Sequence, residues 1–296
     1  MRRALHGLRT PRGRRAVKVV GLSVALPLAL LAALAVTLLA TRTYRLDDAT
    51  WPGTIRHLVV DAGPGDVSVV GSDRPDVFAL WQQRYSLVKP RVEREVRGDV
   101  LALRSRCPAT SFRCAVVLGA QLPRATAVSL RSSSAPLTVS GVSGGVAVTS
   151  QSGAVTVQDV DGPVHVDDGS GKLSLLHVSG DITARTGSGA VELNDVRGRV
   201  EVTTGAGSIT SNASRMTVFA ARSDSGWVTA GFTAPPQRVE VRSSSGAVAL
   251  QLPRGRYRLS LHAPSGKVSL SGITDDPTAT RTITVTSGTS IALEGT

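Results

Sequence analysis

The chain has 296 residues, of which 19% are charged and 3% aromatic, and its formal net charge is +12. The charge is uneven: residues 1–46 contain nine basic and no acidic residues, whereas the remaining residues contain 25 basic and 22 acidic ones. A nucleic-acid-binding domain needs its basic residues clustered on the folded surface. Since the excess lies in the first 46 residues, we expect no nucleic-acid partner.

The basic residues precede an apolar segment. Residues 1–18 carry seven positive charges, and residues 19–40 (VVGLSVALPLALLAALAVTLLA) form a run of 22 residues without a charge. A helix needs about 20 apolar residues to cross a bilayer, and the positive-inside rule keeps its basic end in the cytoplasm. We therefore expect a cytoplasmic tail over 1–18, one transmembrane helix over 19–40 and a linker over 41–52. The chain would be a single-pass protein of the cell membrane, with residues 53–296 extracytoplasmic.

A cleavable secretory signal is the alternative interpretation of the same segment. The apolar region of such a signal is normally about 7–15 residues long, which is shorter than the run found here. Both interpretations place the rest of the chain outside the cytoplasm.

Residues 53–126 form the first, irregular part of a predicted β-repeat domain that spans 53–296. Alternating apolar residues separated by glycine or proline are typical of short strands. Six strands are predicted in this part, over residues 55–61, 66–71, 77–85, 91–97, 99–105 and 115–122.

The two cysteines, Cys107 and Cys114, lie seven positions apart in this part of the chain. An oxidising compartment favours their pairing. A zinc site would need a second pair of cysteine or histidine ligands at a matching spacing, which the sequence does not offer. We expect a disulfide between them, with two free thiols as the alternative.

Between residues 127 and 273 the sequence repeats every 18 residues. The second and fourth places of each repeat are apolar, which predicts a half-buried strand. A Ser-Gly pair usually follows; glycine adopts positive φ without a steric cost, so this pair predicts a turn. A second strand with two further apolar residues comes next. The repeats begin at Ala127, Gly145, Pro163, Asp181, Arg199, Thr217, Arg238 and Arg256, and the sixth is three residues longer.

This pattern predicts an all-β fold, a β-solenoid or parallel β-helix-like stack of two-strand rungs of about 18 residues. A single rung cannot bury its apolar residues alone, so the rungs stack about 4.8 Å apart and share one core. Residues 274–296 would form a shortened last rung, whose uncovered edge favours self-association or docking of a partner. Calcium β-rolls carry aspartate at a fixed place of each turn, whereas aspartate is sporadic here, so we expect no bound metal or cofactor.

The basic tail, the single apolar segment, the opening LVVDAGPGDVSVVGS and the recurring SGxVxVxxVxG units resemble a bacterial, actinobacterial-like family of β-strand-repeat ectodomains. That family is named “putative adhesin”. The resemblance covers residues 54–295. It implies a membrane-anchored, non-enzymatic domain at the cell envelope, and it supplies no catalytic residues to transfer.

Few residues suggest chemistry. His165 stands beside Asp167 and Asp168, and a His/Asp cluster can bind a metal or act as a base. No other repeat contains it and no third ligand accompanies it, so an exposed strand face is the simpler interpretation. We expect no catalytic, cofactor or metal site; a glycan-active enzyme on a β-helix remains the less favoured alternative.

The outward places of the second strand are nearly uncharged, whereas those of the first carry both charges. We expect this polar face to contact cell-wall glycan or an envelope membrane protein, although threonine also suits exposed strands for its own sake. The function predicted is binding or scaffolding at the cell envelope, and the alternative is a stress-sensing module that acts with a membrane partner. The face consists of Thr138, Thr156, Ser174, Thr210, Thr229, Ser269, Gln158, Asn194 and Asn212.

Overall fold

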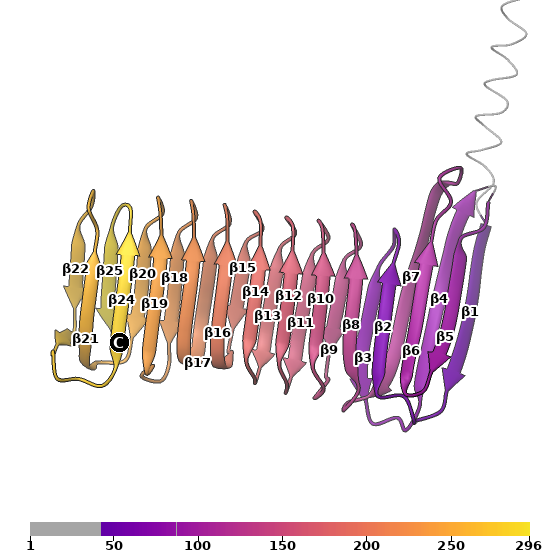
Figure 1. The fold of residues 1–296 in the computed structure, drawn as a ribbon, viewed down its shortest axis with the longest axis horizontal. Helices are drawn as coiled ribbons and strands as arrows, with labels where there is room; N and C mark the ends of the chain where they lie inside the picture. The colour runs from indigo at the N-terminus through magenta and orange to yellow at the C-terminus, as the bar shows by residue number, and fades with distance from the viewer. Residues whose placement is uncertain (1–42, 87) are drawn as a thin grey trace, which may run out of the picture.

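The computed structural model describes residues 43–86 and 88–296, so the transmembrane helix predicted over 19–40 lies outside the described residues. Within the described ranges, no helix is long and apolar enough to span a membrane. The described chain is all β and forms an elongated rack, with the N-terminal strands at one end and the C-terminal strands at the other (Figure 1). The all-β stack predicted from the repeat is confirmed.

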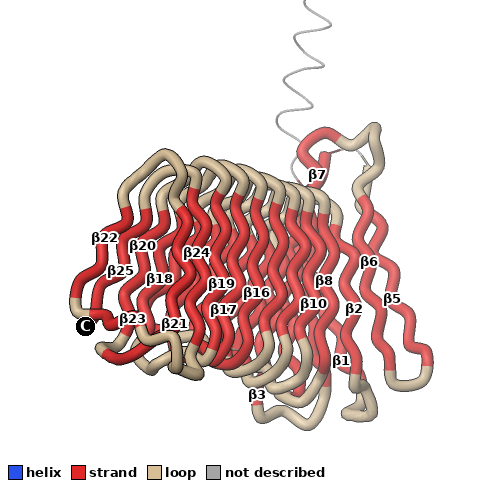
Figure 2. The backbone as a smooth tube through the Cα atoms, turned by 60° about the vertical axis from the view of Figure 1, so that its left-hand side comes forward, coloured by secondary structure: helices blue, strands red, loops and turns tan. Residues whose placement is uncertain are grey.

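Two long sheets face each other along the rack (Figure 2). In sheet A, the order is β1 (Thr43–Trp51), β4 (Val77–Ser86), β7 (Phe112–Pro123), β3 (Val67–Ser72), β9 (Leu137–Ser140), β11 (Val155–Val160), β13 (Leu173–Val178), β15 (Val191–Asn194), the first half of β17 (Ile209–Ser223), β18 (Val228–Phe232), β20 (Val248–Leu252), β25 (Ile291–Gly295) and β22 (Val268–Ser271).

Sheet B runs alongside in the order β5 (Arg91–Arg97), β6 (Val100–Arg106), β2 (His57–Ala62), β8 (Ala127–Ser132), β10 (Val146–Ser150), β12 (Val164–Asp168), β14 (Ile182–Thr186), β16 (Arg197–Thr204), the second half of β17, β19 (Arg238–Ser243), β24 (Thr282–Ser287) and β21 (Gly255–His262). A short strand, β23 (Ile273–Asp275), pairs with the beginning of β21.

The core lies between the sheets and consists of rows of like side chains. In sheet B, Val146 pairs in parallel register with Val128 on one side and Val164 on the other, and all three are buried. Each strand therefore places its apolar residues over those of the next rung, so the 18-residue period becomes a continuous aliphatic core.

The N-terminal end contains the six strands predicted for it, β2 to β7. β2 and β3 act as a first rung beneath β8 and β9, whereas β4 to β7 extend both sheets with antiparallel pairs. The linker predicted over 41–52 is wrong for most of its length. Residues 43–51 form β1, which pairs antiparallel with β4 from Thr43↔Tyr85 to Trp51↔Val77. β1 is an exposed edge strand that contains several charged residues. It therefore lacks the alternation of apolar residues from which the other strands were predicted.

Two rungs differ in register from the prediction. In the sixth, an extra residue at Thr217 shifts the pairing, so Phe219 and Ala221 are buried instead of the predicted Val218 and Ala220. The three-residue insertion is thus split: part of it lies at Thr217, and the rest lies between β17 and β19. In the eighth, Leu259 and Leu261 continue the core rows through their pairing with Ile283 and Val285.

The turn glycines are required for a different reason from the one predicted. None of Gly171, Gly189 and Gly207 has positive φ. Each instead lies against the turn of the preceding rung: a Cβ on Gly189 would stand 1.8 Å from the carbonyl oxygen of Gly171. The left-handed conformation occurs at another corner, where six of the rungs have one residue that adopts it: Gly141, Asp159, His177, Asp195, Ala213 and Gly272.

The rung formed by residues 274–296 was predicted to be the end of the stack, and this prediction is wrong. β24 lies between β19 and β21, and β25 lies between β20 and β22, as the yellow strands in Figure 1 show. The preceding rung, β21 and β22, therefore occupies the end of the rack. Asp276 holds the turn by which the chain returns: it accepts hydrogen bonds from the Thr278 hydroxyl (2.6 Å) and amide (2.9 Å), which lower the pKa of its carboxyl.

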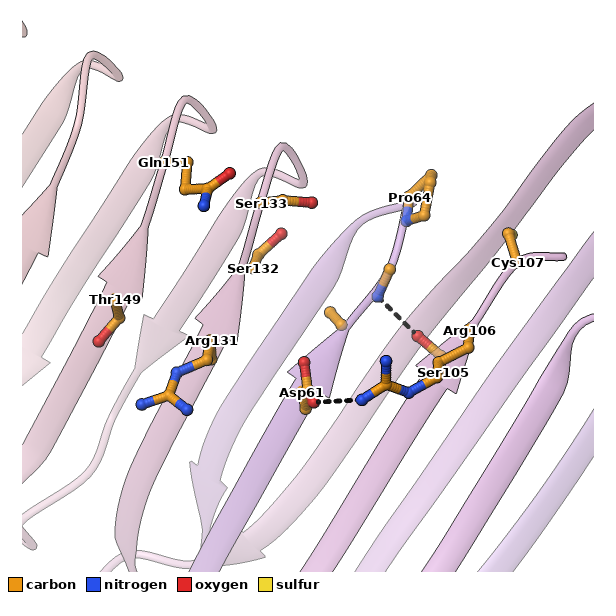
Figure 3. A pocket seen from close by; sticks show the side chains of 12 residues that line it. Asp61, Pro64, Ser105, Arg106, Cys107, Arg131, Ser132, Ser133, Thr149 and Gln151 are labelled. Atoms are coloured by element: carbon orange, nitrogen blue, oxygen red, sulfur yellow. Dashed lines mark hydrogen bonds and ion pairs between the residues drawn. The ribbon is translucent and has the colours of Figure 1, made fainter. Parts of the chain in front are cut away.

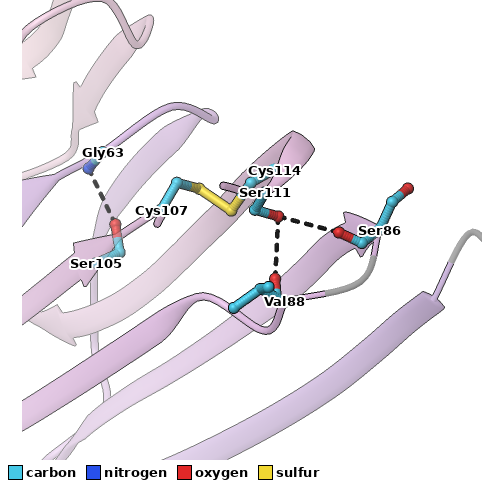
Figure 4. Close-up of a disulfide and its surroundings, with 7 residues drawn as sticks. All are labelled: Gly63, Ser86, Val88, Ser105, Cys107, Ser111 and Cys114. Atoms are coloured by element: carbon cyan, nitrogen blue, oxygen red, sulfur yellow. Dashed lines mark hydrogen bonds between the residues drawn. A yellow bond between two sulfur atoms is a disulfide. The ribbon is translucent and has the colours of Figure 1, made fainter. Parts of the chain in front are cut away.

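Cys107 and Cys114 are joined by a disulfide whose Cα atoms lie 5.8 Å apart. It closes the loop between β6 and β7, beside the segment that follows β4 (Figure 4). Within this loop the Ser111 hydroxyl donates hydrogen bonds to the carbonyl oxygens of Val88 (3.0 Å) and Ser86 (3.3 Å). The disulfide and these bonds together hold the end of sheet A in place.

Replacement of both Cys107 and Cys114 by serine is expected to lower the free energy of unfolding by about 2–3 kcal/mol, because a loop this short gains that much chain entropy when opened. Thermal unfolding without reductant measures the effect. As a control, reductant should lower the melting temperature of the wild type to that of the variant and leave the variant unchanged. Equal melting temperatures without reductant would contradict the prediction.

Candidate functional site

The outer face of sheet A carries a row of small polar side chains in direct register. Thr138 pairs with Thr156, and Thr156 pairs with Ser174. Further along the rack Thr210 pairs with Thr229. Neighbouring strands lie about 4.8 Å apart, so these hydroxyls repeat at that interval. The complete row, here called the polar ladder, is Ser68, Thr138, Thr156, Ser174, Glu192, Thr210, Thr229, Ala249, Ala292 and Ser269.

The ladder stays electrically neutral despite its one acid. Glu192 Oε1 lies 2.7 Å from the Lys172 ammonium of the neighbouring rung. Beside the ladder runs a second outward column, which contains the predicted Gln158, Asn194 and Asn212; the Asn212 amide donates to Asn194 Oδ1 (3.2 Å). This column is less regular, because Leu176 stands between Gln158 and Asn194. The structure thus aligns the predicted face but divides it into one continuous and one broken column.

Trp227 belongs to the same face and was missed by the sequence analysis. It lies immediately before β18, two residues from Thr229, so strand alternation places both on the outward side. Trp227 is 61% exposed, and the equivalent residues of the neighbouring rungs are the small Ser208 and Ala247. The indole therefore projects from a face that otherwise carries small side chains, and it offers both an apolar plane and one N–H donor. The alternation itself was the signal that could have identified it.

A groove of about 620 Å³ opens beside the turns of the first rungs, next to the disulfide loop (Figure 3). It exists because the turn after β2 is short and lies against the end of β6: the Gly63 amide donates to Ser105 Oγ (3.1 Å). Most of the side chains that line it are polar, and they include Asp61, Arg106, Arg131, Ser133, Thr149 and Gln151; Ala62, Pro64 and Cys107 complete the lining.

The charges in this groove do not balance. Arg106 lies 3.4 Å from Asp61 Oδ2, and Arg131 stands opposite Asp61 in the strand register. Among the described residues Arg131 forms no ion pair, so one guanidinium is left for an anionic group. The groove could hold a carboxylate or phosphate, and none of the described residues that line it is a nucleophile hydrogen-bonded to a base.

The structure separates the His165 cluster. His165 Nε2 lies 2.9 Å from Asp167 Oδ2 on the outer face of sheet B, whereas Asp168 points inward and is 7% exposed. A second exposed pair, His177 Nδ1 and Asp159 Oδ1 (3.1 Å), lies on the left-handed corner. No group of three His, Cys, Asp or Glu side chains within the described ranges is arranged to hold a metal ion.

Asp168 occupies a place that other rungs give to a hydroxyl. At the equivalent position Thr186 Oγ1 accepts the Gly189 amide (3.0 Å), and Thr204 Oγ1 accepts the Gly207 amide (3.0 Å). Neither carboxylate oxygen of Asp168 has a hydrogen-bond partner among the described residues, although both are buried. The equivalent hydroxyl residues are Ser132, Ser150, Thr186, Thr204, Ser223, Ser243 and Ser287.

Comparison with known proteins identifies a family and a set of remote structural relatives. Residues 120–291 match the family described as “Toastrack DUF4097”, and no curated protein matches the chain. A “putative adhesin” from Bacteroides fragilis NCTC 9343 is 10% identical, over 85% of this chain and 97% of that one, with a TM-score of 0.40. A “putative adhesin” from Parabacteroides merdae ATCC 43184 is 12% identical, over 86% and 97%, with a TM-score of 0.38. This likeness is too remote to transfer an activity.

Proposed function

This chain belongs to the Toastrack DUF4097 family, and from that premise we propose that it is a non-enzymatic binding module of the cell envelope. Residues 19–40 anchor it in the cell membrane, with the N-terminus in the cytoplasm. The β-rack projects on the extracytoplasmic side and binds a hydroxyl-rich polymer of the cell wall through the outer face of sheet A. The apolar run and the seven charges before it support the anchor.

The observation that carries the binding proposal is the polar ladder. Its hydroxyls both donate and accept hydrogen bonds, they follow one line along sheet A, and the neighbouring Lys172 neutralises the only charge among them. A polymer laid along this line would meet a hydroxyl at most rungs, the exceptions being Glu192, Ala249 and Ala292, so many weak contacts add up without a deep pocket. Trp227 would supply an apolar plane for a sugar ring at one point of the ladder.

Purified residues 43–296, which include β1, are expected to co-sediment with isolated cell walls. Because the contacts are neutral hydrogen bonds, pelleting should persist as salt is raised. Replacement of Thr138, Thr156 and Thr210 by lysine should reduce the bound fraction at least tenfold, since three long charged side chains would then stand on the contact line. Trp227→Ala should weaken binding by a smaller factor.

The matched control places lysine on the opposite sheet. Ser129, Thr183 and Thr203 are outward residues of sheet B, so their replacement by lysine adds the same charge away from the ladder and should leave pelleting unchanged. Equal binding by both triple variants would refute the ladder as the contact face. A wild-type domain that does not pellet would instead favour a sensing role with a membrane partner, and crosslinking in membranes would then identify the neighbour.

A further inference from the structure

The two ends of the rack are finished differently. At the N-terminal end, β5 has the sequence RVEREVR and lies outside β6, while the Arg94 guanidinium covers the Trp81 ring at 4.7 Å from its centroid. Charged residues thus close the core there, as terminal repeats of soluble solenoids require. At the other end, the whole of β22 is exposed, including Val268 (45%) and Leu270 (47%).

These exposed aliphatic residues continue the core rows. Val268 pairs with Ile291 and Leu270 pairs with Leu293, and both partners are buried. In sheet B, Leu259 and Leu261 likewise continue the rows of the buried Ile283 and Val285, and both are only partly covered. The end of the rack therefore presents four aliphatic side chains that are placed as core residues and lack a rung above them.

The backbone at this end is also free to pair. The Ile291 amide donates to the Lys267 carbonyl (3.0 Å). In a parallel pair the residues of one strand bond alternately to that neighbour and away from it. The backbone N–H and C=O of Ser269 therefore point to β25, whereas those of Val268 and Leu270 point outward. The Arg258 amide donates to the Arg281 carbonyl (2.9 Å), which by the same pattern turns the groups of Leu259 and Leu261 outward. β23 covers only Gly255 to Tyr257, and Asp275 accepts the Leu259 amide (3.0 Å).

We propose that this end of the rack binds the same end of a second copy of the chain. A two-fold axis parallel to the strands brings β22 of one copy beside β21 of the other, in antiparallel orientation. Val268 then faces Leu261 of the second copy, Ser269 faces Ser260, and Leu270 faces Leu259. Inward-facing residues then lie beside inward-facing residues, so the two aliphatic cores form one continuous core. The unpaired backbone groups of Val268 and Leu261 face each other and can hydrogen-bond.

This arrangement also suits a chain held in a membrane, and in that respect it rests on the proposed anchor. β1 begins at Thr43, and β1 runs from one edge of the sheet to the other along the common strand direction (Figure 1), so Thr43 marks one end of that direction. A two-fold axis parallel to the strands leaves both copies of Thr43 on the same side. The other symmetric choice is an axis perpendicular to the sheets. It would pair β22 of one copy with β22 of the other and place the two copies of Thr43 on opposite sides. The central outward pair, Ser260 and Ser269, carries no charge that would oppose the contact. At its two ends the same register places Lys267 opposite His262 and Ser271 opposite Arg258, so no two arginine or lysine side chains face each other.

The first test measures the mass of the full chain in detergent. The wild type is expected to contain two chains and Val268→Lys one chain, because lysine would bring two charges into the joint. Val268 is exposed in the single chain, so the variant should still fold and melt cooperatively, and its melting temperature should fall only by the amount that dimerisation contributes to the wild type. The control Thr156→Lys lies on the same sheet in mid-rack and should stay dimeric. A single-chain wild type, or a Val268→Lys variant that remains dimeric, would overturn the proposal.

The second test reports the arrangement. A full chain that carries both Ser260→Cys and Ser269→Cys should oxidise to a covalent dimer, because facing residues without mutual backbone bonds have Cα atoms about 4.5 Å apart. Each single cysteine variant should stay monomeric on a denaturing gel; dimers from Ser269→Cys alone would overturn the arrangement. Wall pelleting separates this proposal from the polar ladder, since Val268→Lys should still pellet and the lysine triple variant of the ladder should still dimerise.

Discussion

Replacement of Gly189 by alanine is expected to lower the free energy of unfolding by about 4 kcal/mol or more, which marks an exceptional single substitution. The new Cβ would stand 1.8 Å from the Gly171 carbonyl oxygen, whereas real contacts are near 3.4 Å or longer. The obstacle is backbone, so no side chain can rotate away, and two rungs of one rigid stack would have to separate. For a domain of this size the melting temperature should fall by roughly 8–16 °C, as measured by circular dichroism.

Gly145→Ala is the matched control. Its Cβ would meet only the ring of Pro163 at 3.6 Å and the Pro163 carbonyl oxygen at 3.8 Å, which are ordinary contacts. The control should unfold within about 1 kcal/mol of the wild type, the usual range for a tolerated Gly→Ala change. If both variants lose the same stability, the loss comes from chain entropy or strand propensity and the close approach of the turns is not its cause.

Asp168→Thr is expected to stabilise the protein by about 1–3 kcal/mol, the cost of leaving a buried polar group unpaired. The carboxylate has no partner among the described residues, while a threonine hydroxyl could accept the Gly171 amide as Thr186 accepts the Gly189 amide (3.0 Å). Thermal unfolding at neutral pH should show an increase of roughly 2–12 °C.

The mirror substitution tests the same cause in the opposite direction. Thr186→Asp puts a second carboxylate into the hydroxyl column, directly beside Asp168 in the register, and should destabilise by at least as much as Asp168→Thr stabilises. A combined Asp168→Thr/Thr186→Asp chain should return close to the wild type. Should Asp168→Thr instead destabilise the protein, the carboxylate has a partner in solution, and a search for a bound cation would follow.

The sequence pattern predicted the rack correctly where local alternation and tertiary pairing coincide. The 18-residue period placed Val146, Val164 and their equivalents in one buried row, and the alternation aligned Thr138, Thr156 and Ser174 on one outer face. It failed at Thr217, because a single inserted residue shifts the inward set to Phe219 and Ala221 without disturbing the apolar content. Apolar composition alone cannot tell Val218 from Phe219.

Features that depend on contacts between residues distant in the sequence could not be predicted from the repeat pattern. β1 is recognisable only through its pairing with β4, and the orphaned carboxylate of Asp168 only through the hydroxyls of the neighbouring rungs. The groove beside Arg131 arises where the turn after β2 meets the end of β6, two segments that no periodicity relates. The location of the uncovered end also required the structure, because chain order and spatial order differ there.

The insertion of β24 and β25 between the two preceding rungs sets an order on the biosynthesis of the rack. Strands up to β20 can be added one rung at a time as the chain emerges, because each new pair finds its template already in place. β21 and β22 find none, since the slot beneath them is filled only by residues 282–295. The last rung therefore reaches its final pairing only once residues 282–295 have entered that slot. A product that stops before Thr282 would lack β24 and β25, and would leave the edges of β19 and β20 without the partners that they have in the finished rack.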